Sequence, residues 1–241
     1  MSALARSVSI IVPTLNEAEN IAPLVSRLVA TGIPFQEILF VDDRSTDGTQ
    51  DAIRSIAANF PVRLIEREYG ELGLASAIMT GARAAQGEIL LVLDADLSHP
   101  PERCKDLLAP LFEDRADLVI GSRYIVGGLT PGWPLWRRAL SRIASGLVYP
   151  LTGAHDSMSG FFAISRSKLL ELAPATTGFK IVFEIIVQGG RKLRIREIPI
   201  VFQDRMRGRS KMKFGVALRF FLRWLVAIFR RAFGRRRLCQ F

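Results

Sequence analysis

Ile89-Leu90-Leu91-Val92-Leu93-Asp94-Ala95-Asp96 joins a run of apolar residues to a pair of carboxylates. An apolar run of this length, without polar alternation, predicts a strand that is buried on both faces of its sheet. Such strands are typical of mainly parallel sheets that helices cover on both sides. We therefore expect an α/β protein in which the two carboxylates follow the end of a central strand.

Similar apolar runs alternate with helical patterns through the first half of the chain. Strands are predicted at residues 8–12, 38–41, 62–65, 89–93 and 118–120, and helices at 17–30, 49–59, 74–85 and 102–112. The second half is less regular. It predicts an amphipathic helix at 133–149, a strand at 161–164, a helix beneath the sheet at 179–188 and an edge strand at 195–202.

The composition suits one domain of this kind. The chain has 241 residues, of which 49% are hydrophobic and 23% charged, so it can form a core and is unlike a disordered chain. Of its 33 Lys and Arg residues, 16 lie from Arg191 onward, beside two of the 23 acidic residues. A basic C-terminal segment binds anionic surfaces, either nucleic acid or a membrane, and composition alone does not choose between them.

Residues 214–232 favour the membrane. A helix at these residues would place Arg219, Arg223 and Arg230 on about one face and aromatic and aliphatic residues on the rest. This pattern is typical of a helix that lies in a membrane interface. The sequence has no uninterrupted apolar run of about 18 residues that could span a bilayer, and its first residues lack the apolar part of a signal peptide. We expect an α/β domain at 1–213 and a basic membrane-surface helix and tail at 214–241. We also expect the protein to bind peripherally to the cytoplasmic face of a membrane.

Polar residues follow the other predicted strands as well. In open sheets of this class, ligands bind beyond the carboxyl ends of the strands, so these residues are candidates for a site. They are Pro13-Thr14-Leu15-Asn16-Glu17, Asp42-Asp43-Arg44-Ser45-Thr46-Asp47-Gly48-Thr49, Asp94-Ala95-Asp96 and Gly121-Ser122-Arg123. Three of these strand ends carry acids and one carries an arginine, which suits a metal ion and a phosphate-bearing ligand.

Asp94 and Asp96 are the predicted metal ligands. Residues two apart that leave a strand point to the same side, so both carboxylates can bind one Mg2+ or Mn2+ ion, which also binds diphosphate oxygens. The alternative is that these acids cap the next helix or lie in solvent.

The other acids have structural alternatives too. Asp47 precedes a predicted helix, and we expect it to cap that helix while Asp43 faces the cleft and accepts hydrogen bonds from a nucleobase or ribose. Glu17 either contacts a ligand or is a first-turn residue that the helix dipole favours.

Six segments in order resemble the motif set of dolichol-phosphate (polyprenol-phosphate) mannose synthases, which belong to glycosyltransferase family 2. The resemblance runs from Ser7 to about Lys213. Four of the six are the segments quoted above, of which the third continues through Leu97-Ser98-His99-Pro100-Pro101 and the fourth through Tyr124. The other two are Asp156-Ser157-Met158-Ser159-Gly160-Phe161 and Arg205-Met206-Arg207-Gly208-Arg209-Ser210-Lys211. It implies the GT-A nucleotide-sugar-binding fold and an inverting, metal-dependent transfer of mannose from GDP-mannose to a polyprenyl phosphate.

The resemblance also implies roles by motif position. The guanosine side would be held by Pro13, Leu15, Glu17, Val41 and Asp43, and the ribose, diphosphate and metal by Asp94, Ala95 and Asp96. Arg205 and Lys211 would close over the diphosphate and sugar. Two departures matter: Leu15 replaces a Tyr that would stack on the nucleotide, and Ser98 replaces a Gln in the metal shell, where a water can substitute.

The acceptor chemistry points to cations. A phosphate monoester is already anionic near neutral pH, so it needs positive charge to orient it more than it needs a general base. Arg123, Arg137 and Ser141 are the candidates for binding it, and the family places Arg, Arg and Ser at matching positions. The alternative for Arg137 and its neighbour Arg138 is a solvated helix face. With Asp96, these residues form the predicted catalytic set.

Two rival functions remain at this stage. Similar enzymes transfer glucose or a modified arabinose from a uridine nucleotide, and the donor base is read by loops around residues 41–44. The other rival is an inactive relative whose basic tail binds nucleic acid. The apolar residues interleaved in that tail fit lipid better, so we expect no nucleic acid partner.

Overall fold

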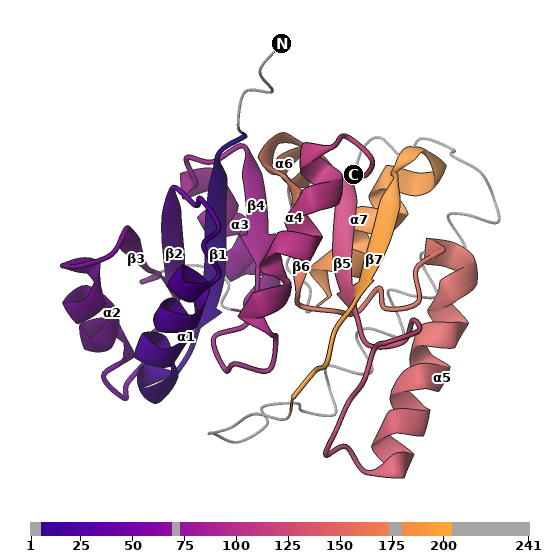
Figure 1. Cartoon of the computed structure of the whole chain (residues 1–241), viewed down its shortest axis with the longest axis horizontal. Coiled ribbons are helices and arrows are strands. Elements are labelled where there is room, and N and C mark those ends of the chain that lie inside the picture. Colours follow the sequence, from indigo (N-terminus) through magenta and orange to yellow (C-terminus); the bar gives the residue numbers. More distant parts are fainter. Residues whose placement is uncertain (1–5, 69–72, 174–179, 204–241) are drawn as a thin grey trace, which may run out of the picture.

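The computed structural model describes residues 6–68, 73–173 and 180–203. Its strands form one seven-stranded sheet in the order β3-β2-β1-β4-β6-β5-β7 (Figure 1). The bounds are β1 (Val8–Thr14), β2 (Glu37–Asp42), β3 (Val62–Glu66), β4 (Ile89–Val92), β5 (Leu118–Ser122), β6 (Phe162–Ser165) and β7 (Ile195–Pro199). All seven predicted strands are confirmed, although the last is shorter than expected because the chain leaves the ladder after Pro199, and Val201 pairs only as an isolated bridge with Leu129.

The sheet is mainly parallel, as predicted. β1, β2, β3 and β4 pair in parallel, and so do β5 and β7. Among the described strands, β6 alone runs the other way, between β4 and β5. The start of β6 therefore lies at the same edge as the carboxyl ends of its neighbours.

The helices are α1 (Ala18–Ala30), α2 (Thr49–Ala57), α3 (Leu74–Ala84), α4 (Cys104–Phe112), α5 (Leu135–Thr152), α6 (Arg166–Leu172) and α7 (Ile181–Gly189), with short 3-10 turns η1 (Pro101–Arg103) and η2 (Gly190–Lys192). All of these α-helices except α5 cover one face or the other of the sheet. The helix α6 was not predicted, because it has only seven residues and follows β6 directly.

Alternate residues of each central strand pack on opposite faces. Ile10 and Phe40 belong to a core that α1, α2 and α4 complete, whereas Ile11 and Leu39 belong to one completed by α3, α6 and α7. All six residues of β2 are buried. This two-sided burial explains why the apolar runs carry no alternation in the sequence.

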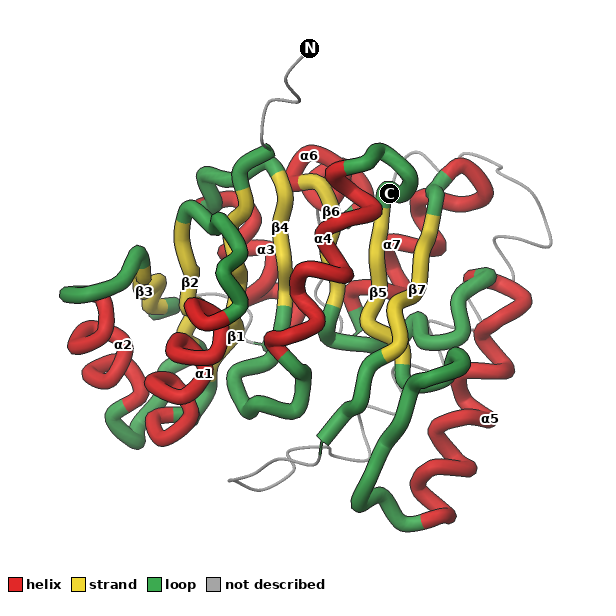
Figure 2. The backbone as a smooth tube through the Cα atoms, viewed as in Figure 1, coloured by secondary structure: helices red, strands yellow, loops and turns green. Residues whose placement is uncertain are grey.

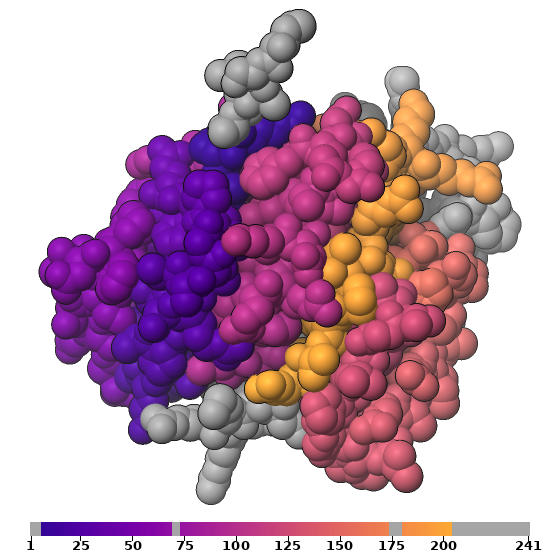
Figure 3. All heavy atoms as spheres, in the orientation of Figure 1, coloured from indigo at the N-terminus to yellow at the C-terminus, as the bar shows by residue number. Residues whose placement is uncertain are grey.

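The helix α5 lies outside these two layers. Its Val148 packs on Phe183 of α7, and the rest of the helix extends past the sheet beside β7 (Figure 1). In Figure 3 it forms a lobe of its own next to the orange residues of β7. Within the described part of the chain, no helix is both long enough and apolar enough to cross a bilayer.

Candidate active site

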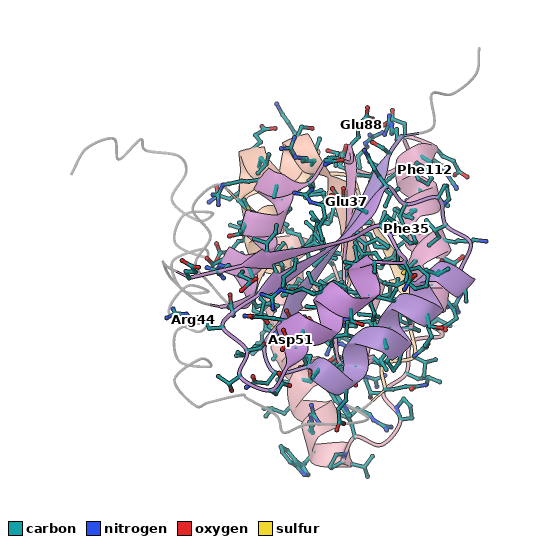
Figure 4. All side chains as sticks on the ribbon, turned by 90° about the vertical axis from the view of Figure 1, so that its left-hand side faces the viewer. Phe35, Glu37, Arg44, Asp51, Glu88 and Phe112 are labelled. Atoms are coloured by element: carbon teal, nitrogen blue, oxygen red, sulfur yellow. The ribbon has the colours of Figure 1, made fainter. Side chains whose placement is uncertain are left out.

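The candidate site residues gather at one edge of the sheet. The carboxyl ends of β1, β2, β4 and β5, the loop before β6 and the start of α7 all lie there, at the lower edge in Figure 2. Figure 4 separates the two edges: Arg44, which follows β2, and Glu88, which precedes β4, lie at different ends of the molecule. Ligand binding at the carboxyl edge is the rule for open sheets of this class.

Asp42 and Asp47 hold the first two loops in shape. The Asp42 carboxylate accepts hydrogen bonds from the Thr14 hydroxyl, from Ser45 and from the Gln50 amide. Asp47 accepts from the N–H of Thr49 at 3.0 Å and from the N–H of Ala18 at 3.1 Å, the first residues of α2 and α1. The predicted capping role of Asp47 is confirmed, and it extends to a second helix.

Asp43 has a buried partner that sequence reasoning missed. Its Oδ1 lies 2.6 Å from Arg67 Nη1, and its Oδ2 accepts from the N–H of Gly73 at 2.7 Å. Both members of the ion pair are buried. Arg67 follows β3 directly, so its position after a predicted strand was the available signal. The pair fixes the Asp43 carboxylate, and its contact with a nucleoside stays a prediction.

The remaining nucleotide-side residues lie around the same loops. Pro13 is half-buried in β1, Leu15 is 38% exposed, and Glu17 accepts a hydrogen bond from the Asn20 amide at 2.7 Å. The side chain of Val41 belongs to the core beneath α3. Arg205 and Lys211 lie outside the described residues.

Asp94 and Asp96 follow β4 as expected. Asp96 is buried, and its Oδ1 accepts from the N–H of Ser98 at 3.0 Å, whereas the Asp94 side chain is 32% exposed. His99 Nδ1 accepts from the N–H of Asp94 at 3.1 Å. Burial lowers the pKa of His99, which favours the neutral ring whose Nδ1 accepts this hydrogen bond and supports the turn.

The surroundings of this carboxylate pair suit a small, hard dication. The Ser98 hydroxyl is buried without a hydrogen-bond partner, which leaves an oxygen available beside Asp96. A Cβ on Gly160 would lie 3.3 Å from both Asp94 oxygens, so the glycine keeps that side open. Within the described ranges, no three His, Cys, Asp or Glu side chains form a metal-binding group, and a bound ion would need phosphate or water oxygens as further ligands.

Arg123 is held by a fully buried carboxylate. Its Nε and Nη2 each donate to Asp156 at 2.7 Å, and its own N–H donates to Asp156 Oδ2 at 2.9 Å. Glu197 of β7 in turn accepts from the N–H groups of His155 and Asp156. The bidentate pair fixes the direction of the guanidinium. Asp156 lay in a segment that the sequence singled out, but its pairing with Arg123 was not foreseen.

The other two acceptor-side candidates lie on α5. Ser141 shares a short hydrogen bond with the hydroxyl of Tyr124, which is the next residue after Arg123. The Arg137 guanidinium lies 4.0 Å from the centre of the Trp133 ring, and the Arg123 guanidinium lies 5.6 Å from the same ring. The structure thus gathers Arg123, Arg137 and Ser141 around two aromatic side chains.

Lys180, at the start of α7, is a further site residue that the sequence did not reveal. It is partly buried, and its Nζ donates to the Met158 carbonyl at 3.3 Å. Burial and the nearby Arg123 outweigh the opposing effect of Asp156 and Asp94, and together these groups lower the pKa of Lys180 to about 8. A lysine at the beginning of a predicted helix gives no local sign of this environment.

The outer face of α5 is apolar and exposed. Trp136 is 69% exposed and Leu140 is 62% exposed. With them stand Leu135, Ile143, Leu147 and Tyr149, and nearby loops add Val126 and Leu129. Large apolar side chains gathered on one helix in this way mark an interaction surface rather than scattered exposure.

Known proteins resemble this chain closely. The family model described as glycosyl transferase family 2 matches residues 9–173. A dolichol-phosphate mannosyltransferase of Pyrococcus furiosus is 38% identical over 214 residues, which are 86% of this chain and 59% of that relative. A relative with the same name from Mycosarcoma maydis is 38% identical over 95% of this chain and 81% of its own length. Another from Saccharomyces cerevisiae is 37% identical over 88% of this chain and 83% of its own length.

Solved structures share the fold. A glucosyl-3-phosphoglycerate synthase of Mycobacterium tuberculosis, in complex with Mn2+, UDP-glucose and phosphoglyceric acid, superposes with a TM-score of 0.71 at 19% identity. The match covers 96% of this chain and 81% of that one. The same enzyme in complex with phosphoglyceric acid gives a TM-score of 0.71 at 20% identity, over 92% and 80% of the two chains. The expected GT-A fold is confirmed.

Proposed function

Because this chain belongs to glycosyl transferase family 2, we propose that it transfers mannose to the phosphate of dolichol or a related polyprenol. Three relatives that are 37–38% identical over most of this chain carry the name dolichol-phosphate mannosyltransferase. The chain spans 59% of the Pyrococcus relative and more than four-fifths of the two fungal ones. The proposed donor is GDP-mannose.

The observation that carries this proposal is the division of charge along the carboxyl edge. Asp94 and Asp96 follow β4, and the cations Arg123 and Lys180 lie on the side of β5 and α7. An acidic pair suits a metal-bound diphosphate donor, and neighbouring cations suit a second, anionic substrate. The phosphate of a polyprenyl phosphate is an anionic acceptor of this kind.

The geometry supports a single displacement. An oxygen of the acceptor phosphate attacks the anomeric carbon of the sugar, the bond from that carbon to the diphosphate breaks, and the nucleoside diphosphate leaves with the electron pair. The configuration at the sugar is thereby inverted. The second ionisation of a phosphate monoester has a pKa near 6, so the nucleophile needs orientation by Arg123 rather than a general base.

Asp94 and Asp96 are the residues that would hold a divalent cation, Mg2+ or Mn2+. Such an ion, when bound, neutralises charge on the leaving diphosphate. The chain itself supplies the fixed geometry: the Ser98 N–H orients the Asp96 carboxylate, and His99 Nδ1 holds the main chain at Asp94. The Mn2+ named in the M. tuberculosis structure belongs to that enzyme, and the ion preferred here is part of the proposal.

A polyprenyl acceptor places the enzyme at a membrane surface, and we propose that it binds there peripherally on the cytoplasmic face. Two features support this. The exposed apolar face of α5 begins next to Arg137 and Ser141, so lipid and phosphate would approach from one side. The basic segment 214–241 was predicted from sequence to lie in an anionic interface, and it falls outside the described residues.

The proposal is tested by incubating the full chain with citronellyl phosphate, Mg2+ or Mn2+, and a panel of labelled nucleotide sugars. We expect label in the prenyl product from GDP-mannose, and none with Asp96→Ala, because that variant loses one of two metal-binding carboxylates. Retention of near-normal turnover by Asp96→Ala at saturating metal would remove Asp96 from the site. Transfer from UDP-glucose instead of GDP-mannose would reject the proposed donor and retain the reaction class.

A further inference from the structure

The ammonium group of Lys180 lies inside the charge cluster of the site although α7 is otherwise a core helix. Lys180 precedes α7, whose Ile181, Val182 and Ile185 are buried in the core beneath the sheet. Its Nζ donates to the carbonyl of Met158, in the loop before β6 that also carries Asp156. The side chain thus reaches from α7 to the loop that fixes Arg123.

Lys180 adds a second cation beside the Arg123–Asp156 pair. Asp156 binds the Arg123 guanidinium through two side-chain hydrogen bonds of 2.7 Å, so that pair contributes little net charge. Lys180 is close enough to Arg123 for the two charges to repel each other. An incoming phosphate is held by cations of this kind near its oxygens.

The environment of Lys180 disfavours a cation even beside two carboxylates. The side chain is partly buried, and burial together with Arg123 lowers its pKa more than Asp156 and Asp94 raise it. A charge kept in such a place is more often found at functional sites than elsewhere. A phosphate bound between Lys180 and Arg123 would relieve both the desolvation and the repulsion between the two cations.

From this geometry we infer that Lys180 binds the acceptor phosphate together with Arg123. The acceptor is favoured over the donor because Lys180 and the Arg123–Asp156 pair belong to the β5, β6 and α7 side of the sheet. The fixed Asp43–Arg67 pair lies on the β2 and β3 side, where the nucleoside is proposed to bind. This inference rests on the proposed function, since it assigns a role toward that acceptor.

The experiment compares Lys180→Met and Lys180→Arg with the unchanged chain and with Lys192→Met. Met keeps the length of the side chain without its charge, and Arg keeps the charge. Lys192 is an exposed lysine of η2, so its replacement controls for the loss of one positive charge. Each protein is assayed with citronellyl phosphate and GDP-mannose, and citronellyl phosphate and GDP binding are also measured by calorimetry.

We expect Lys180→Met to raise the KM and Kd for citronellyl phosphate at least about tenfold, because it removes a charge-assisted hydrogen bond. The Kd of Lys180→Met for GDP should change less than about twofold. Lys180→Arg should recover most of the affinity for citronellyl phosphate. Lys192→Met should have the same KM and Kd values as the unchanged chain. Thermal unfolding of Lys180→Met should not shift downward, since the variant removes a desolvated charge.

Three results would overturn the inference. The first is an unchanged Kd for citronellyl phosphate in Lys180→Met. The second is a selective loss of GDP affinity, which would move Lys180 to the donor side. The third is a lowered unfolding temperature with a parallel loss of affinity for citronellyl phosphate and GDP, which would make the role of Lys180 structural. Failure of the proposed function is a separate result: the unchanged chain would neither bind citronellyl phosphate nor transfer sugar to it.

Discussion

At the scale of single residues, Gly160 controls the space beside Asp94. A Cβ at this position would lie 3.2 Å from His99 Cε1 and 3.3 Å from both Asp94 oxygens. These contacts are tighter than ordinary van der Waals contact, so the carboxylate or the ring would have to move by a few tenths of an ångström. If Asp94 binds a metal ion as proposed, such a shift is poorly tolerated, because coordination distances are fixed within about 0.2 Å.

Gly160→Ala is therefore expected to reduce turnover about tenfold or more and to raise the metal concentration needed for half-maximal activity. The measurement is initial rate against Mg2+ or Mn2+ concentration. Gly146→Ala is the matched control, because nothing lies within 4 Å of a Cβ there, and alanine should stabilise α5 by up to about 1 kcal/mol. An unchanged metal dependence in Gly160→Ala would show that Asp94 does not bind the ion.

Asp156 makes a second prediction at this scale. Asp156→Asn would leave the nearly buried Arg123 guanidinium without its counter-ion, and breaking such a pair costs about 3 kcal/mol of unfolding free energy. Turnover should fall as well, since Arg123 loses its orientation. Urea unfolding measures the first effect. Asp51→Asn, which breaks an exposed pair with Arg54, should cost less than about 0.5 kcal/mol; an equal cost for both variants would contradict the prediction.

Sequence alone located one side of each of the two buried ion pairs. Asp43 and Arg123 follow apolar strands, and that local pattern is readable. Their partners were not readable, because Arg67 is 24 residues from Asp43 and Asp156 is 33 residues from Arg123. Which carboxylate meets which arginine depends on the order of strands in the sheet and on the path of the loops, and neither leaves a local periodic signal.

At the scale of elements, one carboxylate joins β5, β7 and α6. Asp117, just before β5, accepts hydrogen bonds from the N–H and the guanidinium of Arg194 and pairs with Lys168 of α6 at 3.1 Å. Burial opposes ionisation, but these hydrogen bonds outweigh it and lower the pKa of Asp117 to about 2 from an ordinary value of 3.8. Three elements distant in sequence are thus held by one charge.

The pH dependence of stability follows from the sign of that shift. A carboxylate with a lowered pKa stabilises the fold above its unfolded pKa, and the contribution is lost as pH falls through the folded value. Asp117→Asn should therefore reduce the unfolding free energy by about 1 kcal/mol at pH 7, after allowing for solvent screening, and the deficit should shrink between about pH 4 and pH 2. Denaturant unfolding across this range tests it, and a deficit independent of pH would contradict it.

The elements themselves were largely predictable. Strands such as β2 and β4 are buried on both faces, and their apolar runs identify them directly. The helix α6 was missed because seven residues carry too little periodicity. The direction of β6 was not predicted either, since its four residues have the same composition in a parallel or an antiparallel pairing. That direction brings the Asp156 loop to the carboxyl edge, so part of the site depends on it.

At the scale of the whole molecule, two surfaces are proposed to contact the membrane. The exposed apolar face of α5 offers insertion that depends little on salt. The arginines of residues 214–241 offer attraction to anionic lipid, on the order of 1 kcal/mol for each residue near the surface, which salt weakens. The two contributions differ in their salt dependence, and that difference makes them separable.

We expect truncation after Lys213 to remove the salt-sensitive part of binding to anionic vesicles, and Leu140→Gln with Ile143→Gln to remove much of the remainder. Both side chains are more than 60% exposed, so the double variant should fold normally.

The control for the double variant is Val29→Gln, at a half-exposed apolar site on α1. Sedimentation with vesicles at low and high salt measures the effect, and transfer to a long polyprenyl phosphate should fall more than transfer to citronellyl phosphate. If the truncated protein sediments as strongly as the intact one, the basic segment is not an anchor, and the α5 surface alone must account for attachment.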